Sequence, residues 1–184
     1  LPRLAGMFAL AVWDATEGAL WIARDRIGIK PLYYSAVDGG LAFASELRAL
    51  VVWQGKVPPV SAQGLTEFLR LGYVPGPASI FEGIYKLPPG CFAVFRSGVL
   101  TEPQAYWKLT DVVRAGMAQP LADTRQALDT LEAKLRGAVA SHMVSDVPLG
   151  AFLSGGIDSS TVVALMQAQS SRPVKTFSIG FHEH

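Results

Sequence analysis

The chain has 184 residues, of which 50% are hydrophobic and 17% charged, so it can form a packed core instead of staying disordered. A formal net charge of +1, without a Lys/Arg run, argues against nucleic-acid binding. The single cysteine excludes an internal disulfide and points to a reducing, cytoplasmic compartment. No apolar stretch reaches about 18 residues, so no membrane span is expected. Three histidines and one cysteine form no metal-ligand pattern.

The first half of the chain carries the signals of antiparallel β structure. Residues 6–13 are almost all apolar and predict a strand that is buried on both faces. Residues 19–23 follow a turn and are expected to form a second strand. Residues 32–34 and 41–44 flank an Asp-Gly-Gly turn and predict a β-hairpin, because Asp-Gly tolerates positive φ.

Two short helices are expected among these strands, and residues 91–95 predict a further strand. The first helix begins at Ser45. Ser61 is expected to cap the second helix and Gly72 to end it. The apolar stripe of this second helix consists of Leu65, Phe68 and Leu69.

The pattern weakens after residue 109, and residues 110–122 are interpreted as a linker. Asp123, with Gln126 three residues later, resembles a capping box and begins an amphipathic helix. The apolar face of that helix consists of Leu128, Leu131, Leu135, Ala138 and His142. We expect His142 to be packed and hydrogen-bonded, without a catalytic role.

The last part of the chain predicts a strand over residues 147–153, a helix over 158–169 and a buried strand over 174–181. A strand, a helix and a strand with this spacing form a βαβ unit, which implies a parallel sheet.

The turn inside this unit, residues 154–160, reads Ser-Gly-Gly-Ile-Asp-Ser-Ser and is predicted to bind pyrophosphate. Ligands of open parallel sheets bind at the carboxyl ends of strands, and a helix N-terminus offers free N–H groups and partial positive charge. Gly155 and Gly156 let an anion approach the backbone, and the serines add hydroxyl donors. Asp158 is explained if it holds Mg²⁺ bridged to phosphate oxygens.

Other phosphate-binding patterns fit these residues poorly. The Walker motif needs a Lys after its last glycine, and none follows here. The dinucleotide fingerprint needs a third glycine where Ser159 stands. A helix start whose small residues serve only packing is the remaining alternative.

Ser154-Gly155-Gly156-Ile157-Asp158-Ser159 resembles the SGGxDS motif of the PP-loop ATP pyrophosphatase family, which cleaves ATP between its α and β phosphates and adenylates a substrate. The flanking sequence resembles the glutamine-hydrolysing asparagine synthetases. The segments that carry this second resemblance are residues 6–14, 23–34, 43–46, 72–77, 86–90 and 145–153.

The resemblance implies two domains. Residues 1–109 would be the later part of a class II glutamine amidotransferase domain with an α+β, N-terminal nucleophile hydrolase-like (αββα) fold. Residues 123–184 would be the first part of an α/β PP-loop domain with a Rossmann-like parallel sheet. Ammonia from glutamine would pass through an internal tunnel to the second domain, where aspartate is amidated through β-aspartyl-AMP with ATP and Mg²⁺. The full-length protein is expected to be a homodimer.

Carried over by motif, the pyrophosphate ligands would be Ser154, Gly155, Gly156, Asp158 and Ser159, with Asp158 directed toward Mg²⁺. Leu153 and Ile179 would contact adenosine or, alternatively, serve only as core residues. The glutaminase nucleophile of the family is an N-terminal Cys, which Leu1 does not match, so no catalytic residue is expected here. Cys91 is expected to be structural.

Both ends of the chain are expected to lie inside a longer protein, and the chain alone is expected to catalyse neither half-reaction. A synthetase for another carboxylate and a non-catalytic nucleotide-binding module remain as alternatives. A further group, Arg24, Asp25, Arg26 and Lys30, reads either as a polar cluster near the domain interface or as a strand end with surface ion pairs.

Overall fold

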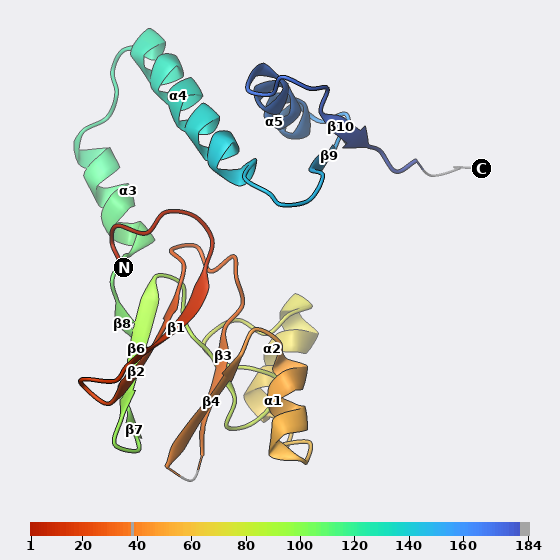
Figure 1. Ribbon diagram of the computed structural model, residues 1–184. Coiled ribbons are helices and arrows are strands. Elements are labelled where there is room, and N and C mark those ends of the chain that lie inside the picture. The colour runs from red at the N-terminus through yellow and green to blue at the C-terminus, as the bar shows by residue number, and fades with distance from the viewer. Residues whose placement is uncertain (38, 181–184) are drawn as a thin grey trace. The chain divides into compact units, whose positions relative to one another are not determined.

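The structure is a computed structural model that describes residues 1–37 and 39–180 (Figure 1). The chain divides into two compact units, Leu1–Gly116 and Met117–His184. Among the described residues, the first unit holds two antiparallel sheets, two short helices and most of a third helix, and the second holds a parallel strand pair with two helices. Each unit is described by itself.

The larger sheet of the first unit is antiparallel, with the order β1-β2-β6-β7 and with β8 also paired to β6. Its strands are β1 (Ala9–Asp14), β2 (Ala19–Arg24), β6 (Cys91–Arg96), β7 (Val99–Leu100) and β8 (Gln104–Ala105). The expected strands over residues 19–23 and 91–95 are confirmed as β2 and β6.

The smaller sheet has the order β4-β3-β5, from β3 (Tyr33–Val37), β4 (Gly40–Ala44) and β5 (Tyr85–Lys86). β3 and β4 pair in the expected antiparallel hairpin, although Asp38 of its turn lies outside the described residues. Helix α1 (Leu47–Gln54) packs against β3 and β4. It begins two residues later than expected, with Glu46 as N-cap and no side-chain capping bond.

The core of the first unit lies between its two sheets. Ile22 on β2 and Ala93 on β6 are fully buried, and Tyr34 supplies the aromatic ring from β3. The buried cluster is completed by Leu32, Leu87 and Cys91. Because alternate strand residues point to one face, only one side of each strand enters this core.

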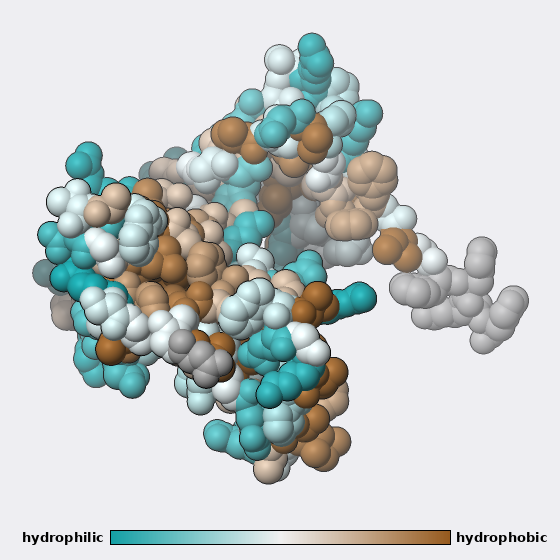
Figure 2. Space-filling view, turned by 60° about the horizontal axis from the view of Figure 1, so that its bottom comes forward, coloured by the Kyte–Doolittle hydropathy of each residue, from teal (hydrophilic) through white to brown (hydrophobic). Residues whose placement is uncertain are grey.

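Strand β1 is not buried on both faces, contrary to the expectation from its apolar run. Val12 and Trp13 are 53% and 61% exposed. β1 is an edge strand that pairs only with β2 among the described residues, so no described strand covers its other edge. Figure 2 shows brown, apolar patches on one face of the molecule.

Helix α2 (Ala62–Leu71) has the expected ends. The Ser61 hydroxyl accepts a hydrogen bond from the Gly64 N–H at 3.1 Å, and Gly72 ends the helix in the left-handed conformation with φ 77°. The apolar stripe of this helix is not buried: Leu65, Phe68 and Leu69 are 43%, 48% and 76% exposed. Gly64, on another side of the helix, makes the close packing, since a Cβ there would lie 2.4 Å from the Ser79 carbonyl oxygen.

Residues 109–118, for which no helix was expected, form helix α3 (Leu109–Ala118). Its sequence has no N-cap residue and no side chain of the helix is buried, so the usual signals for a helix are weak there. Residues 119–123 connect α3 to the next helix.

The second unit contains the expected βαβ arrangement. Helix α4 (Thr124–His142) precedes β9 (Gly150–Phe152), α5 (Ile157–Ala168) and β10 (Lys175–Phe177), and β9 and β10 pair in parallel. The Asp123 carboxylate caps α4 by accepting from the Gln126 N–H at 2.8 Å. α4 packs against α5.

β9 and β10 are both shorter than expected, and β10 is exposed where a buried strand was predicted. Phe177 is 56% exposed, because β10 has one partner, β9, among the described residues. Residue 181, the last of the predicted strand, lies outside the described part of the chain. No described helix combines the length and apolar character needed to cross a membrane.

Candidate functional site

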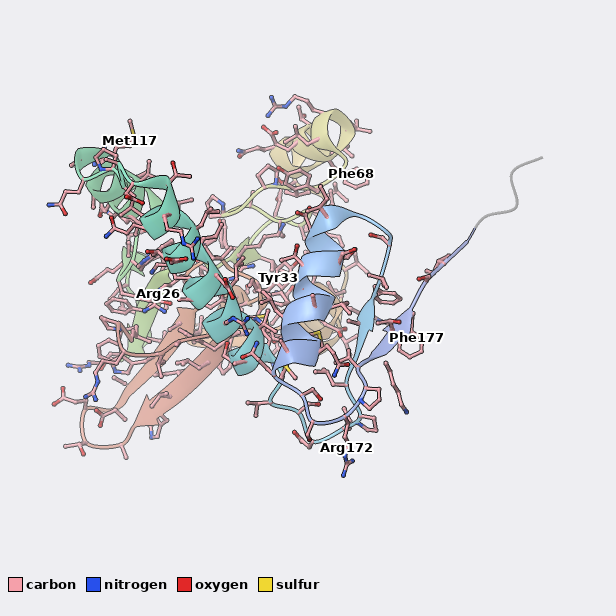
Figure 3. All side chains as sticks on the ribbon, turned by 90° about the horizontal axis from the view of Figure 1, so that it is seen from above. Arg26, Tyr33, Phe68, Met117, Arg172 and Phe177 are labelled. Carbon is pink, nitrogen blue, oxygen red and sulfur yellow. The ribbon has the colours of Figure 1, made fainter. Side chains whose placement is uncertain are left out.

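The pyrophosphate-binding candidate lies at the carboxyl ends of the parallel strands β9 and β10. The Leu153 N–H donates to the Phe177 carbonyl at 2.8 Å, directly after the paired residues. Gly150 leaves room for the Phe177 ring, since a Cβ there would lie 2.6 Å from the ring of this residue, which is labelled in Figure 3. The chain leaves β9 through residues 154–156 and enters α5 at Ile157.

The backbone of this loop presents a set of free donors. Within residues 1–37 and 39–180, the N–H groups of residues 154–159 donate no hydrogen bond to a protein acceptor. Gly155 has φ +82°, a conformation that L side chains rarely adopt, and Gly156 caps α5 without a side-chain bond. The loop therefore offers an anion several N–H groups and the positive end of a helix dipole.

Side chains of the motif complete the site. The Ser154 and Ser159 hydroxyls lie 3.0 Å apart, and Ser159 Oγ donates to the Gly156 carbonyl at 3.2 Å. Asp158 is exposed in the first turn of α5. The structure thus brings the expected residues Ser154, Gly155, Gly156, Asp158 and Ser159 together on one loop and helix turn.

Leu153 and Ile179, the expected adenosine contacts, follow the two neighbouring strands. Leu153 is partly buried and Ile179 is 73% exposed. Neither side chain is fully buried among the described residues. Both positions lie at the edge of the sheet that carries the loop.

The donor set fits a nucleotide phosphate bound with Mg²⁺. A lone carboxylate is sufficient for Mg²⁺ when phosphate oxygens and water supply the other ligands. No group of three or more His, Cys, Asp or Glu residues that could hold a metal occurs among the described residues. Asp158 beside free N–H groups is therefore suited to a phosphate-bound cation, and the loop offers no self-sufficient metal cage.

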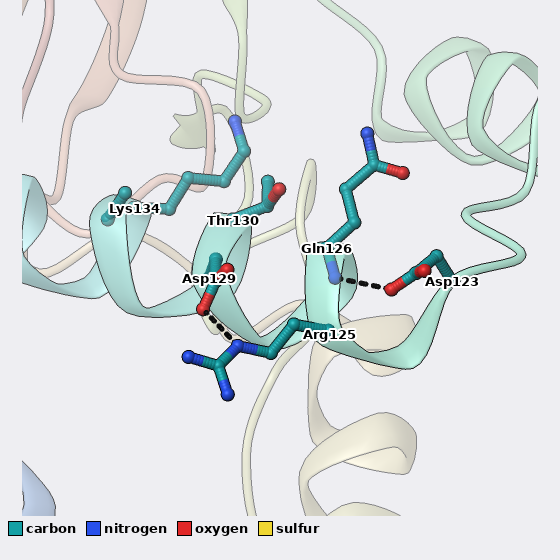
Figure 4. A pocket seen from close by; sticks show the side chains of 7 residues that line it. Asp123, Arg125, Gln126, Asp129, Thr130 and Lys134 are labelled. Carbon is teal, nitrogen blue, oxygen red and sulfur yellow. Dashed lines mark hydrogen bonds and ion pairs between the residues drawn. The ribbon is translucent and has the colours of Figure 1, made fainter.

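A hollow of about 840 Å³ runs along α4 and is lined mostly by residues with polar or charged side chains (Figure 4). Its side chains all come from α4 and its cap. Asp123 caps the helix, and Arg125 pairs with Asp129 at 3.4 Å. These interactions stabilise a helix start, and no loop or second element converges there, so this hollow is not a catalytic candidate.

His142 at the end of α4 is hydrogen-bonded, as expected. Its Nδ1 lies 2.8 Å from the Ala138 carbonyl oxygen, which can only accept, so Nδ1 carries the proton. The residue is exposed, and it also lines an apolar pocket of about 410 Å³ between α4 and α5.

Asp25, at the end of β2, is a buried carboxylate that organises the loop after it. One oxygen accepts from the N–H groups of Ile27 and Ile29 at 3.2 and 3.0 Å, and the other accepts from Lys30 at 2.9 Å. Burial alone would raise the pKa of Asp25, but backbone hydrogen bonds, led by those of Lys30 and Ile29, outweigh it and hold the pKa below its usual value.

The arginines beside Asp25 also bind backbone. Arg24 donates to the carbonyls of Lys30, Leu87 and Gly28 at 2.7–2.8 Å, and Arg26 donates to the carbonyls of Leu4 and Pro2. These arginines and Lys30 form no ion pair with a described residue. The interpretation as surface ion pairs is therefore wrong for the described residues, because Arg24, Asp25 and Arg26 bind backbone groups of the neighbouring loops.

Cys91 lies in the core between the two sheets of the first unit and is 8% exposed. Burial raises the pKa of its thiol, although Lys108 opposes this change. A thiol with a raised pKa forms little of the nucleophilic thiolate. This agrees with a structural role.

Comparison with known proteins matches both units. Residues 1–107 match the glutamine amidotransferase domain family, and residues 130–184 match the asparagine synthase family. The chain is 40% identical over 98% of its length to a Mycobacterium tuberculosis protein provisionally named as a glutamine-hydrolysing asparagine synthetase. It is 34% identical over 98% of its length to asparagine synthetase 1 of Bacillus subtilis, and 31% over 90% to an amidase of Gibberella zeae. It spans 28%, 27% and 24% of these relatives' lengths.

Proposed function

The chain belongs to the glutamine amidotransferase family, with a second segment of the asparagine synthase family, and we propose that it is part of a glutamine-hydrolysing asparagine synthetase. The complete protein would transfer ammonia from glutamine to the β-carboxylate of aspartate, through an aspartyl adenylate, and release AMP and pyrophosphate. The observation that carries the ATP-dependent step is the loop of free N–H groups at residues 154–159, placed after β9.

The proposed chemistry in the second unit is binding and charge stabilisation. The loop N–H groups and the hydroxyls of Ser154 and Ser159 would hold the β and γ phosphates of ATP. Leu153 and Ile179 would lie against adenosine. Asp158 would hold Mg²⁺, which neutralises charge on the departing pyrophosphate. Aspartate attacks the α-phosphate, and activation splits a difficult amide synthesis into two easier steps.

The first unit is proposed to be the later part of an αββα hydrolase domain, over residues 1–109. Its two stacked antiparallel sheets with α1 against one of them support this assignment. The second unit, over residues 123–184, is proposed to be the first part of a PP-loop domain. The parallel pairing of β9 and β10 across α5 supports it.

A synthetase that acts on another carboxylate is the second candidate. The observation that favours it is the similarity to an amidase of Gibberella zeae, whose name does not refer to asparagine. The two candidates share the ATP-dependent step and differ in the acceptor acid.

Exchange of labelled pyrophosphate into ATP by the complete protein tests both candidates. We expect exchange to require aspartate and to fall at least about 100-fold in Asp158→Asn, because the variant loses the carboxylate that holds Mg²⁺. Asp129→Asn, an exposed change in the same unit, should keep exchange within about twofold. Glutamine hydrolysis, assigned to the other unit, should be unchanged in both variants. Exchange that depends on a different acid would overturn the asparagine assignment, and full exchange by Asp158→Asn would overturn the metal-binding role.

A further inference from the structure

Ser178, the residue after β10, joins the two parallel strands at the point where the phosphate loop begins. Its hydroxyl donates to the Leu153 carbonyl at 2.6 Å. The Leu153 N–H in turn donates to the Phe177 carbonyl at 2.8 Å. The backbone C=O and N–H of Leu153 are thus both hydrogen-bonded to two successive residues, Ser178 and Phe177, at the end of β10. Ser178 extends the β9–β10 ladder by one side-chain hydrogen bond, although sequence signals did not mark it.

This contact controls the first peptide of the loop. In a trans peptide the C=O and the following N–H point in opposite directions. When Ser178 holds the Leu153 carbonyl, the Ser154 N–H must therefore point away from Ser178, and it donates to no acceptor among the described residues.

The same contact reaches the start of α5 through the serine pair. Ser154 Oγ lies 3.0 Å from Ser159 Oγ, and Ser159 Oγ donates to the Gly156 carbonyl at 3.2 Å. Ser178 is thus connected to the first turn of α5 through the Leu153–Ser154 peptide, the Ser154 side chain and the hydrogen bonds of Ser159. The loop itself contains Gly155 at φ +82° and no buried side chain, so it has few other restraints.

We propose that Ser178 is a positioning residue that pre-orients the phosphate loop through the Leu153 carbonyl, so that MgATP binds without first ordering the loop. This inference rests on the proposed function, because it takes MgATP as the ligand of the loop. Ser178 acts through Leu153 and makes no contact with the nucleotide. Without its hydroxyl, the Leu153 carbonyl bonds to water and its peptide can rotate. Ligand binding then has to offset the entropy of ordering the loop.

The test uses the complete protein with three single changes. Ser178→Ala removes the hydroxyl, Ser178→Thr keeps it, and Ser171→Ala is the control, since Ser171 is exposed and makes no side-chain hydrogen bond to a described residue. The dissociation constant for MgATP is measured by calorimetry. KM for ATP and kcat are measured by pyrophosphate exchange, and the melting temperature reports folding.

We expect Ser178→Ala to raise the dissociation constant and KM for MgATP about fivefold to tenfold, with kcat changed less than twofold. Ser178→Thr and Ser171→Ala should bind like the parent. If Ser178→Ala binds MgATP like the parent, or if its sole effect is a lower melting temperature, the positioning role is contradicted. The proposed function of the chain is not affected by that result. Weak binding by Ser178→Thr equal to that of Ser178→Ala contradicts the positioning role as well. A parent protein that binds no MgATP overturns the proposed function together with this inference.

Discussion

At the scale of single residues, the charged side chains at the end of β2, Arg24, Asp25 and Arg26, form hydrogen bonds with backbone groups and no ion pair with another described side chain. Asp25 is 2% exposed and accepts hydrogen bonds from three N–H groups of the loop that follows it. Removal of one partner from a buried hydrogen bond leaves the other unsatisfied, at a cost of about 1–3 kcal/mol. Asp25 is therefore a residue at which a nearly isosteric change has a measurable effect.

We expect Asp25→Asn to lower the free energy of unfolding by about 2 kcal/mol at pH 7, because the amide offers one acceptor oxygen and no charge. Urea denaturation gives this value. Asp14→Asn is the control: Asp14 also accepts from two backbone N–H groups, of Thr16 and Glu17, but in a solvent-accessible turn. Its effect should stay below about 1 kcal/mol.

The same substitution has an expected pH dependence. The pKa of Asp25 is lowered in the folded state, so the unfolded chain takes up the proton first as the pH falls. The stability that the carboxylate contributes is complete above the usual pKa of about 4 and is lost as the pH falls through the lower, folded value. The difference between parent and Asp25→Asn should therefore shrink below about pH 4. A difference that stays constant to pH 2 would contradict the lowered pKa.

At the scale of helices and strands, capping signals predicted both ends of α2 and the start of α4. Ser61 caps α2 through its bond to the Gly64 N–H, and replacement of such a cap by Ala costs about 1 kcal/mol. We expect this loss for Ser61→Ala in urea denaturation. Ser45→Ala makes a matched control, because Ser45 was expected to begin a helix but makes no capping bond to α1. Equal losses in the two variants would show that the Ser61 contact is not what stabilises α2.

Burial was harder to predict from the sequence than element type. The turn at Gly72, the cap at Asp123 and the phosphate loop depend on nearby residues, so their sequence signals are sufficient. The exposure of Trp13 depends on β1 being an edge strand, which only the strand order of the sheet reveals. Ser178 could not be found from its own signal, a small polar residue after a strand, because its role depends on the Leu153 carbonyl across the ladder.

At the scale of the whole molecule, the two compact units correspond to the two family matches. The first unit, Leu1–Gly116, contains the matched residues 1–107, and the second, Met117–His184, contains the matched residues 130–184. Each unit has its own packing: the core cluster between two sheets in the first, and the contact of α4 with α5 in the second. A substitution in one core is thus expected to act on its own unit.

Hydrogen exchange measured by mass spectrometry tests this separation. Ile22 is fully buried in the first core, and Met166 of α5, 7% exposed, lines the apolar pocket between α4 and α5. Large-to-small core changes cost about 2–5 kcal/mol, which opens the affected unit more often. We expect Ile22→Ala to speed exchange in β2, β3 and β6 while α5 keeps the parent rate. Met166→Ala should speed exchange in α5 while β2, β3 and β6 keep the parent rate. Faster exchange in both units from either change would mean that they unfold as a single cooperative body.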